Sequence, residues 1–249
     1  MNGFVDRFRE EKMGFLRVLG ILPEFRRRGV GRCLVERAVE SLKERGMKSI
    51  KGWTREGRGA CKSLLEGMGF TLTRVSNAMR ADFKKIPYNI GEHEKLTMRE
   101  MEMSKDDMEL VRWLNNETFQ EHFNFRSYTS EEYAFWLTNK PWGCDILRVF
   151  IASLDEPVGY VEAGIDSKFI EDKGIKRGWL LSIGVLKPNR RKGIGTALMQ
   201  QAMEFLKSNG MTDVELGVDD ANPTKAIELY KKLGFKIVYK ELTYTKKIG

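Results

Sequence analysis

The chain has 249 residues, a net charge of +8 and an apolar fraction of 41%, enough for one large or two modest domains with packed cores. No apolar run reaches the roughly 18 residues of a membrane-spanning helix, and the N-terminus lacks the apolar stretch of a signal peptide. Three widely spaced cysteines and two histidines argue against a disulfide framework and a metal site. We therefore expect a cytoplasmic protein without a bound metal.

The positive charge lies in the N-terminal part of the chain. Residues 1–90 hold 20 Lys and Arg against 10 Asp and Glu, a net charge of +10, whereas residues 91–249 have a net charge of −2. Such an excess can attract an anionic partner such as nucleic acid. No stacked-aromatic or helix-turn-helix pattern accompanies it, so we favour solvated helices and a phosphate-binding loop over a nucleic-acid surface.

The first series of expected elements begins with two strands and continues through a basic, glycine-containing loop into a helix. In chain order these elements are strands at Gly3–Arg9 and Phe15–Leu22, the loop Arg26–Gly31, a helix at Val30–Glu44, a strand near Ile50–Trp53, a helix at Ala60–Leu65 and a strand pair near Thr71–Phe83.

The second series is longer and opens with elements that the first series lacks. Ser104 is expected to cap its first helix, with Asp106 and Asp107 in the first turn. The expected order is a strand at Lys95–Met101, this helix, a short helix from Ser130 through Trp136, strands at Leu147–Ser153, Val158–Ile165 and Trp179–Leu186, the loop Arg190–Gly195 with its helix, a strand at Val214–Val218, a helix at Thr224–Leu233 and a strand pair at Lys236–Lys240 and Leu242–Lys246.

The two series are copies of one unit. The loop Arg26–Gly31 returns 164 residues later as Arg190–Gly195, and matching Gly-Met and Gly-Phe pairs follow in both copies. A repeat that keeps its register over this length indicates a duplicated structural unit. We expect an abbreviated first unit at 1–85, either naturally short or part of a longer protein, a linker at 86–94 and a complete domain at 95–249.

These residues resemble the GNAT superfamily of acetyl-CoA-dependent N-acetyltransferases. The family motif, Arg or Gln-x-x-Gly-x-Gly or Ala after an apolar strand, occurs in both copies, and the second copy adds Asn222 and a helix in which Tyr230 precedes Leu-Gly-Phe. The tandem arrangement, with the segment Asn115–Phe123, is similar to mycothiol-synthase-type proteins. The resemblance implies an α/β, tandem GNAT fold, with a mixed, mostly antiparallel sheet flanked by helices and a first copy abbreviated at its N-terminus.

The resemblance also implies where acetyl-CoA binds. Backbone N–H groups and basic side chains of the second loop would hold the pyrophosphate at the start of a helix, and the preceding strand would pair with the pantetheine arm. Asn222 could be a contact of this arm or a helix N-cap. The expected cofactor-binding residues are Ile183, Val185, Arg190, Arg191, Lys192, Gly193, Ile194, Gly195, Thr196 and Asn222.

Tyr230 is the expected catalytic acid, which would return a proton to the sulfur of CoA; the alternative is a ring packed on the sheet. The general base remains open between Glu162, Asp219 and Asp220. Ser182 occupies the position where many family members carry a carboxylate, and it cannot act as a base alone.

The first copy lacks the expected acid. Leu65 falls on the position of Tyr230, and Gly57 falls on that of Asn222. We therefore expect the first unit to be non-catalytic, although its loop is complete.

The expected function is transfer of an acetyl group from acetyl-CoA to an amine, with a small molecule favoured over a protein N-terminus as acceptor. The alternatives are a regulatory module that binds acyl-CoA without turnover and a protein- or nucleic-acid-associated acetyltransferase. The sequence does not fix the oligomeric state.

Overall fold

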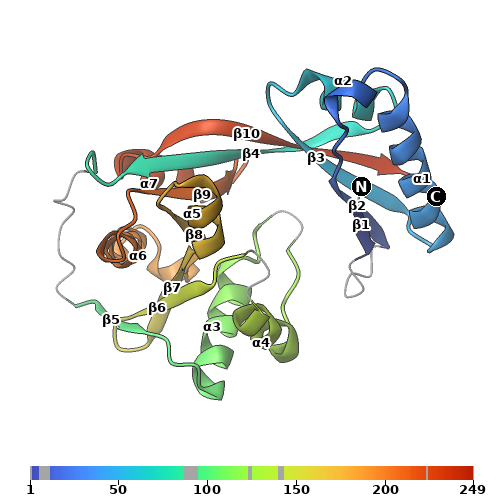
Figure 1. The fold of residues 1–249 in the computed structure, drawn as a ribbon. Helices are drawn as coiled ribbons and strands as arrows, with labels where there is room; N and C mark the ends of the chain where they lie inside the picture. Colours follow the sequence, from blue (N-terminus) through green and yellow to red (C-terminus); the bar gives the residue numbers. More distant parts are fainter. Residues whose placement is uncertain are drawn as a thin grey trace. The chain divides into compact units, whose positions relative to one another are not determined.

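The computed structural model describes residues 2–5, 12–86, 95–122, 125–139, 143–222 and 224–248. The chain forms two compact units (Figure 1). The first consists of Met1–Asn77, Asp219–Ala221 and Tyr239–Gly249, and the second of Ala78–Val218 and Asn222–Val238. The predicted linker at 86–94 lies outside the described residues from 87 onward.

The second unit is built on a mixed sheet. Strands β5 to β8 pair antiparallel in chain order, and β8 pairs parallel with β9. The strands are β5 (Thr97–Glu100), β6 (Ile146–Ser153), β7 (Pro157–Ile165), β8 (Arg177–Val185) and β9 (Asp213–Asp219).

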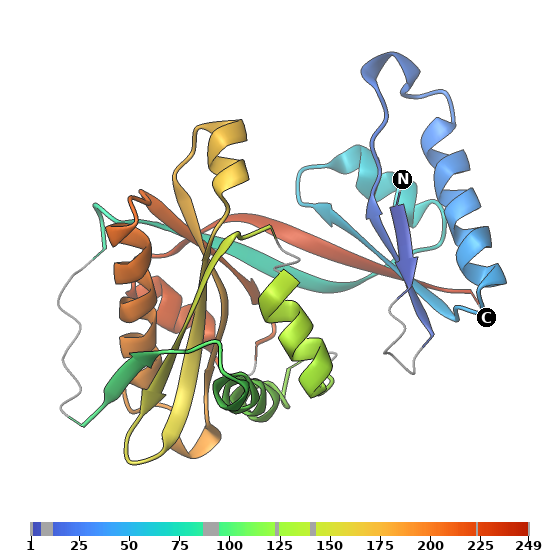
Figure 2. The same ribbon diagram turned by 60° about the horizontal axis from the view of Figure 1, so that its bottom comes forward.

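Helices cover both faces of this sheet (Figure 2). Neighbouring residues of β7 show the two faces, because Tyr160 packs in a core with residues of α3 and α4, whereas Val161 packs in the core that contains α6. Ser104 caps α3 as predicted, since its side chain accepts a hydrogen bond from the N–H of Asp107 at 3.2 Å. The helices are α3 (Lys105–Thr118), α4 (Ser130–Asn139), α5 (Ser167–Lys173), α6 (Ile194–Ser208) and α7 (Ala226–Lys232).

The first unit repeats the second half of this plan. The parallel register of β2 and β3 runs from Met13–Ser49 to Leu16–Gly52, and each of these residues has its counterpart 164 positions later in β8 and β9. The elements are β1 (Asn2–Val5), β2 (Met13–Val18), α1 (Val30–Glu44), β3 (Ser49–Arg55) and α2 (Gly59–Glu66).

Each of the two predicted strand pairs is instead one long strand, β4 (Thr71–Asp82) and β10 (Lys236–Lys247). Neither run contains the Gly or Pro that would close a hairpin, so the backbone stays extended. β4 belongs to the first unit as far as Asn77 and to the second from there on, and β10 passes from the second unit to the first after Val238. Each unit therefore contains a stretch of strand from the other copy.

Two further details differ from the sequence prediction. Helix α5 was not expected, and α4 continues three residues beyond Trp136. Asp166 caps α5, since its side chain accepts a hydrogen bond from the N–H of Phe169 at 2.8 Å. A helix of only seven residues leaves a weak pattern in the sequence, which is why it was not predicted. Within the described part of the chain, no helix is long and apolar enough to cross a membrane.

Candidate active site

The phosphate-binding loop predicted in the second unit leads into α6. Arg191 and Gly193 both have left-handed backbone conformations, with φ values of 64° and 85°, and the helix begins at Ile194. The N–H of Ala197 donates to the carbonyl of Gly193, and the N–H groups before it have no acceptor within the helix. Such a turn presents adjacent N–H donors and the positive end of the helix dipole to an anion.

The basic side chains of this loop are in two different situations. Arg190 is held inside the unit, because its guanidinium donates to the carbonyl of Val185 at 3.0 Å, the carbonyl of Thr118 at 3.2 Å and the carboxylate of Glu121 at 2.7 Å. Arg191 and Lys192 are exposed, and their side chains have no partner among the described residues. Arg190 thus fixes the loop to the end of α3 and leaves two cations free.

Glu121 is the carboxylate at this junction. It accepts hydrogen bonds from Lys187 at 2.8 Å and from Arg190, and these bonds lower the pKa of Glu121 to about 2. Glu121 therefore remains charged throughout the neutral range.

Strands β8 and β9 separate just before the loop. Within these two fully described strands, no pair follows Leu180–Leu216, although β8 continues to Val185. β8 also carries a bulge, because Glu162 faces Ser182 and Ala163 faces Leu180, so that Leu181 has no partner in β7. The end of β8 therefore has unpaired backbone groups on the side where β9 diverges.

Gly195 lies where α6, α7 and β8 meet. A Cβ atom at this position would be 3.5 Å from Leu229 of α7 and 3.8 Å from Val185. Ile183 and Val185 are half-buried and pack against the core around α6, with Leu229. The structure thus brings the predicted strand residues, the start of α6 and α7 together.

Tyr230 follows Leu229 in α7. Tyr230 is buried, with 6% of the residue exposed, and its ring lies 6.0 Å from the ring of Phe235. Burial raises the pKa of Tyr230 to about 12, and its hydroxyl has no hydrogen-bond partner among the described residues. The phenol is therefore protonated at neutral pH and free to donate.

Asn222 stabilises the turn before α7. Its side-chain oxygen accepts from the N–H of Thr224 at 2.8 Å and from the Thr224 hydroxyl at 2.5 Å. The N-cap of α7 is Lys225, with φ of 56°, so the alternative that Asn222 is the N-cap is wrong.

The three candidate bases lie in different surroundings. Glu162 is 2% exposed and accepts a hydrogen bond from the Tyr133 hydroxyl at 2.6 Å, and burial raises the pKa of its carboxyl group. Asp219 is paired with Arg74, and Asp220 accepts from the side-chain N–H of Asn77 at 2.8 Å, both within the first unit. All three carboxylates already have structural partners.

A row of hydrogen bonds that the sequence did not reveal runs from α3 to β8. The Asn115 side chain donates to the Tyr160 hydroxyl at 2.6 Å, and this hydroxyl is 2.7 Å from the hydroxyl of Ser182. The signal available in the sequence was the spacing of Tyr160 and Glu162, two polar residues on one face of an otherwise apolar strand. This row gives Ser182 a fixed position beside the bulge.

The loop of the first unit has the same conformation as that of the second. The Nε of Arg26 donates to the carbonyl of Ile21 at 3.0 Å, and Arg27 and Gly29 have φ values of 61° and 79°. The space beside its second glycine is narrower, because a Cβ at Gly31 would lie 3.0 Å from Ile21 and 3.3 Å from the Leu64 side chain.

Comparison with known proteins identifies the class. The acetyltransferase (GNAT) family matches residues 2–70 and 108–235, and the chain belongs to this family of acyltransferases, whose members use acetyl-CoA. The double match agrees with the tandem fold.

Individual relatives are similar over different lengths. The chain is 30% identical over 219 residues to a mycothiol acetyltransferase of Thermobispora bispora, a match that covers 87% of this chain and 71% of that protein. It is 44% identical over 95 residues to an N-alpha-acetyltransferase of Sulfurisphaera tokodaii, covering 36% of this chain and only 56% of that relative. A tandem GNAT protein from the clavulanic acid biosynthesis pathway matches its fold with a TM-score of 0.76 and 16% identity, covering 96% of this chain and 76% of the other.

Proposed function

We propose that residues 95–249 transfer the acetyl group of acetyl-CoA to the amine of a small molecule. The observation that carries this proposal is the junction at Gly195, where free N–H groups at the start of α6, the diverging end of β8 and the helix of Tyr230 lie together. This junction offers donors for a pyrophosphate and, beside them, an opening for an extended chain.

Each part of the junction has a defined role in the proposed complex. The first N–H groups of α6, with Arg191 and Lys192, hold the pyrophosphate. Backbone groups of Ile183 and Val185 pair with the pantetheine arm, as a neighbouring strand would. An N–H at the bulge by Leu181 donates to the thioester carbonyl, and one such donor contributes about 3 kcal/mol to transition-state stabilisation.

In the chemical step, the neutral amine forms a bond to the carbonyl carbon, and the carbon–sulfur bond breaks. Tyr230 donates its phenolic proton to the departing sulfur. Its ring is buried and its hydroxyl has no described partner, and a pKa of about 12 keeps the phenol protonated at neutral pH. Because a thiol has a pKa of about 8.5, this role requires the phenol to become more acidic once acetyl-CoA is bound. The burial and hydrogen bonds of Glu162 favour a structural role over that of a base, so we assign the amine proton to solvent.

The choice of a small acceptor rests on the tandem relatives. The match to a mycothiol acetyltransferase runs through both copies, whereas the match to an N-alpha-acetyltransferase covers 95 residues. The second relative favours a peptide N-terminus as the alternative acceptor.

Release of CoA from acetyl-CoA, followed with a thiol reagent, tests the proposal. We expect turnover with at least one amine from a panel of amino sugars, aminoglycosides and polyamines, and less than a tenth of that rate with peptides that have free N-termini. Faster turnover with peptides would assign the alternative acceptor. Binding of acetyl-CoA without CoA release from any acceptor would favour a regulatory module.

A further inference from the structure

The first unit contains a pocket of about 420 Å³ that is separate from its phosphate-binding loop. We call it the α2 pocket, since it lies between the turn before α2, that helix, and strands β4 and β10. Its charged lining consists of Arg55, Glu56, Arg58, Lys62, Glu66 and Lys240. Its volume is within the usual range of small-molecule sites, roughly 300–1,000 Å³.

Two of the four cations in this lining lack a counterion. Lys62 lies 3.9 Å from the carboxylate of Glu66, and Arg55 lies 4.0 Å from that of Glu241. The side chains of Arg58 and Lys240, by contrast, have no partner among the described residues, and Lys240 is half-buried. A partly desolvated ammonium group without a partner is costly, and an anionic ligand removes this cost.

The turn between β3 and α2 gives the pocket an accessible backbone. Gly57 has φ of 86°, and a Cβ atom built on either Gly57 or Gly59 meets nothing within 4 Å. The turn is fixed to β10 by a hydrogen bond from the N–H of Glu56 to the carbonyl of Lys240 at 2.9 Å. Arg58 is therefore carried by a turn of defined conformation, next to Lys240.

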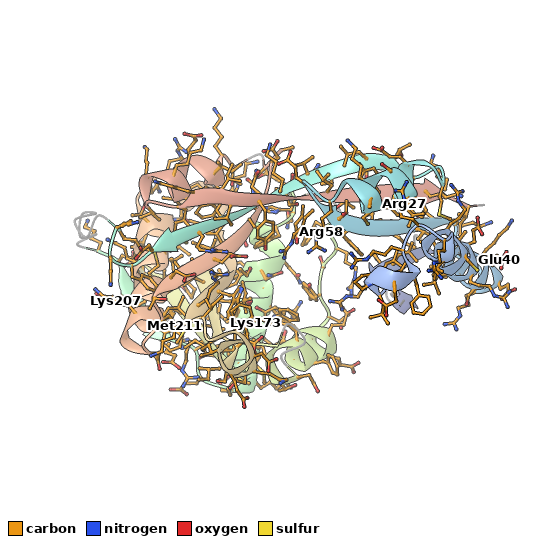
Figure 3. The ribbon with its side chains drawn as sticks, turned by 45° about the horizontal axis from the view of Figure 1, so that its top comes forward. Arg27, Glu40, Arg58, Lys173, Lys207 and Met211 are labelled. Carbon is orange, nitrogen blue, oxygen red and sulfur yellow. The ribbon has the colours of Figure 1, made fainter. Side chains whose placement is uncertain are left out.

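The positive charge of the pocket is not inherited from the repeat. The counterparts of Arg55 and Lys62 in the second copy are Asp219 and Ile227. The three basic residues of the loop, in contrast, are basic in both copies, and none of them lines the α2 pocket. Figure 3 labels Arg27, which belongs to the loop before α1, and Arg58, which belongs to the turn before α2.

We propose that the α2 pocket binds a phosphate monoester of a small organic molecule. The phosphate lies between Arg58 and Lys240, whose cationic side chains make charge-assisted hydrogen bonds to its oxygens. The organic group packs on the apolar wall of Leu72, Val75 and Leu242. This ligand is distinct from acetyl-CoA, whose pyrophosphate belongs to the loops.

The test is a titration of the full-length, ¹⁵N-labelled protein with phenyl phosphate at pH 7.5, followed by NMR at the amides of Gly57 and Gly59. We expect saturable shifts at both amides and at least tenfold weaker binding in the double variant Arg58→Ala/Lys240→Ala. The matched control, Arg37→Ala/Lys43→Ala on α1, removes the same charge and should bind as the wild type does. Lowering the pH to 5 should also weaken binding, because the phosphate then carries one negative charge instead of two.

Several outcomes would overturn the proposal. Equal affinity in the Arg58/Lys240 variant, or an equal loss in the α1 control, would show that these cations are not the site. Shifts confined to Arg26–Gly31 would assign the probe to the phosphate-binding loop. Equal affinity for phenol would show that the pocket does not require a phosphate group. Equal affinity for inorganic phosphate would show that it does not require the organic group of an ester.

Discussion

Replacing Tyr230 with Phe isolates the proposed proton donation. The change removes one hydroxyl from a buried ring, and this hydroxyl has no described partner, so the free energy of unfolding should change by less than about 1 kcal/mol. Loss of a general acid lowers kcat by about 10²–10⁴-fold, which corresponds to about 2.7–5.5 kcal/mol in activation free energy. The dissociation constant of acetyl-CoA should stay within about twofold, since a proton that moves only in the transition state adds little to ground-state binding.

The assay is single-turnover CoA release at saturating acetyl-CoA, so that chemistry limits the measured rate. Tyr244→Phe is the matched control, because it also removes one tyrosine hydroxyl, but this hydroxyl donates to Glu66 at 3.0 Å in the first unit and lies outside the proposed active site. It should cost about 1 kcal/mol of stability and leave kcat unchanged. The pKa of about 12 also predicts no loss of acid function between pH 7 and pH 10. An unchanged single-turnover rate in Tyr230→Phe, or a basic limb near pH 8.5 that this variant abolishes, would refute the assignment.

Two further predictions concern the same unit. Gly195→Ala should raise thermal stability, because alanine favours a helix by up to about 1 kcal/mol and the new Cβ makes ordinary contacts, while acetyl-CoA binding measured by calorimetry should weaken at least tenfold. The control is Gly20→Ala, where a new Cβ meets nothing within 4 Å. Unweakened binding in Gly195→Ala would show that the pantetheine arm lies elsewhere. Glu162 has a raised pKa when folded, so its contribution to stability is complete below the unfolded pKa and is lost as pH rises through the folded value. Glu162→Gln should therefore gain stability relative to the wild type between pH 4.5 and pH 7 in urea titrations, and a constant difference across this range would contradict the raised pKa.

The sequence predicted the features that depend on local pattern. The helix at Val30–Glu44 has the predicted bounds, and both loops lie where the glycine spacing placed them. The sequence could not predict that β4 and β10 each serve two units, because extended residues carry no local mark of which sheet they join.

The residues of the candidate site could be predicted only in part, for the same reason. The spacing of Asn222 and Tyr230 identified the helix, but the burial of Glu162 and its bond to Tyr133 depend on how α4 packs. The row through Tyr160 to Ser182 joins two strands and a helix, and such contacts between distant segments leave no periodic signal.

The last prediction is that the first unit makes no acetyl transfer. Leu65, at the position of Tyr230, is buried in the apolar core and has no proton to donate. The two units also differ beside the strand that precedes the loop. A Cβ at Gly184 would lie 2.2 Å from the Thr118 hydroxyl oxygen of α3, whereas a Cβ at its counterpart Gly20 has no described atom within 4 Å. The double variant Tyr230→Phe/Gly195→Ala disables the second unit and leaves the first unit's residues intact.

This double variant should transfer acetyl groups at no more than about a hundredth of the wild-type rate with every acceptor that the wild type uses. It should nevertheless remain folded by circular dichroism, since neither change removes a hydrogen bond between described groups. Gly29 and Gly31 keep the loop of the first unit intact, so residual binding of acetyl-CoA to this variant is compatible with the prediction. Acetyl transfer by the double variant above a tenth of the wild-type rate would show instead that the first unit is a working enzyme. Its proton would then have to come from a group other than the position occupied by Leu65.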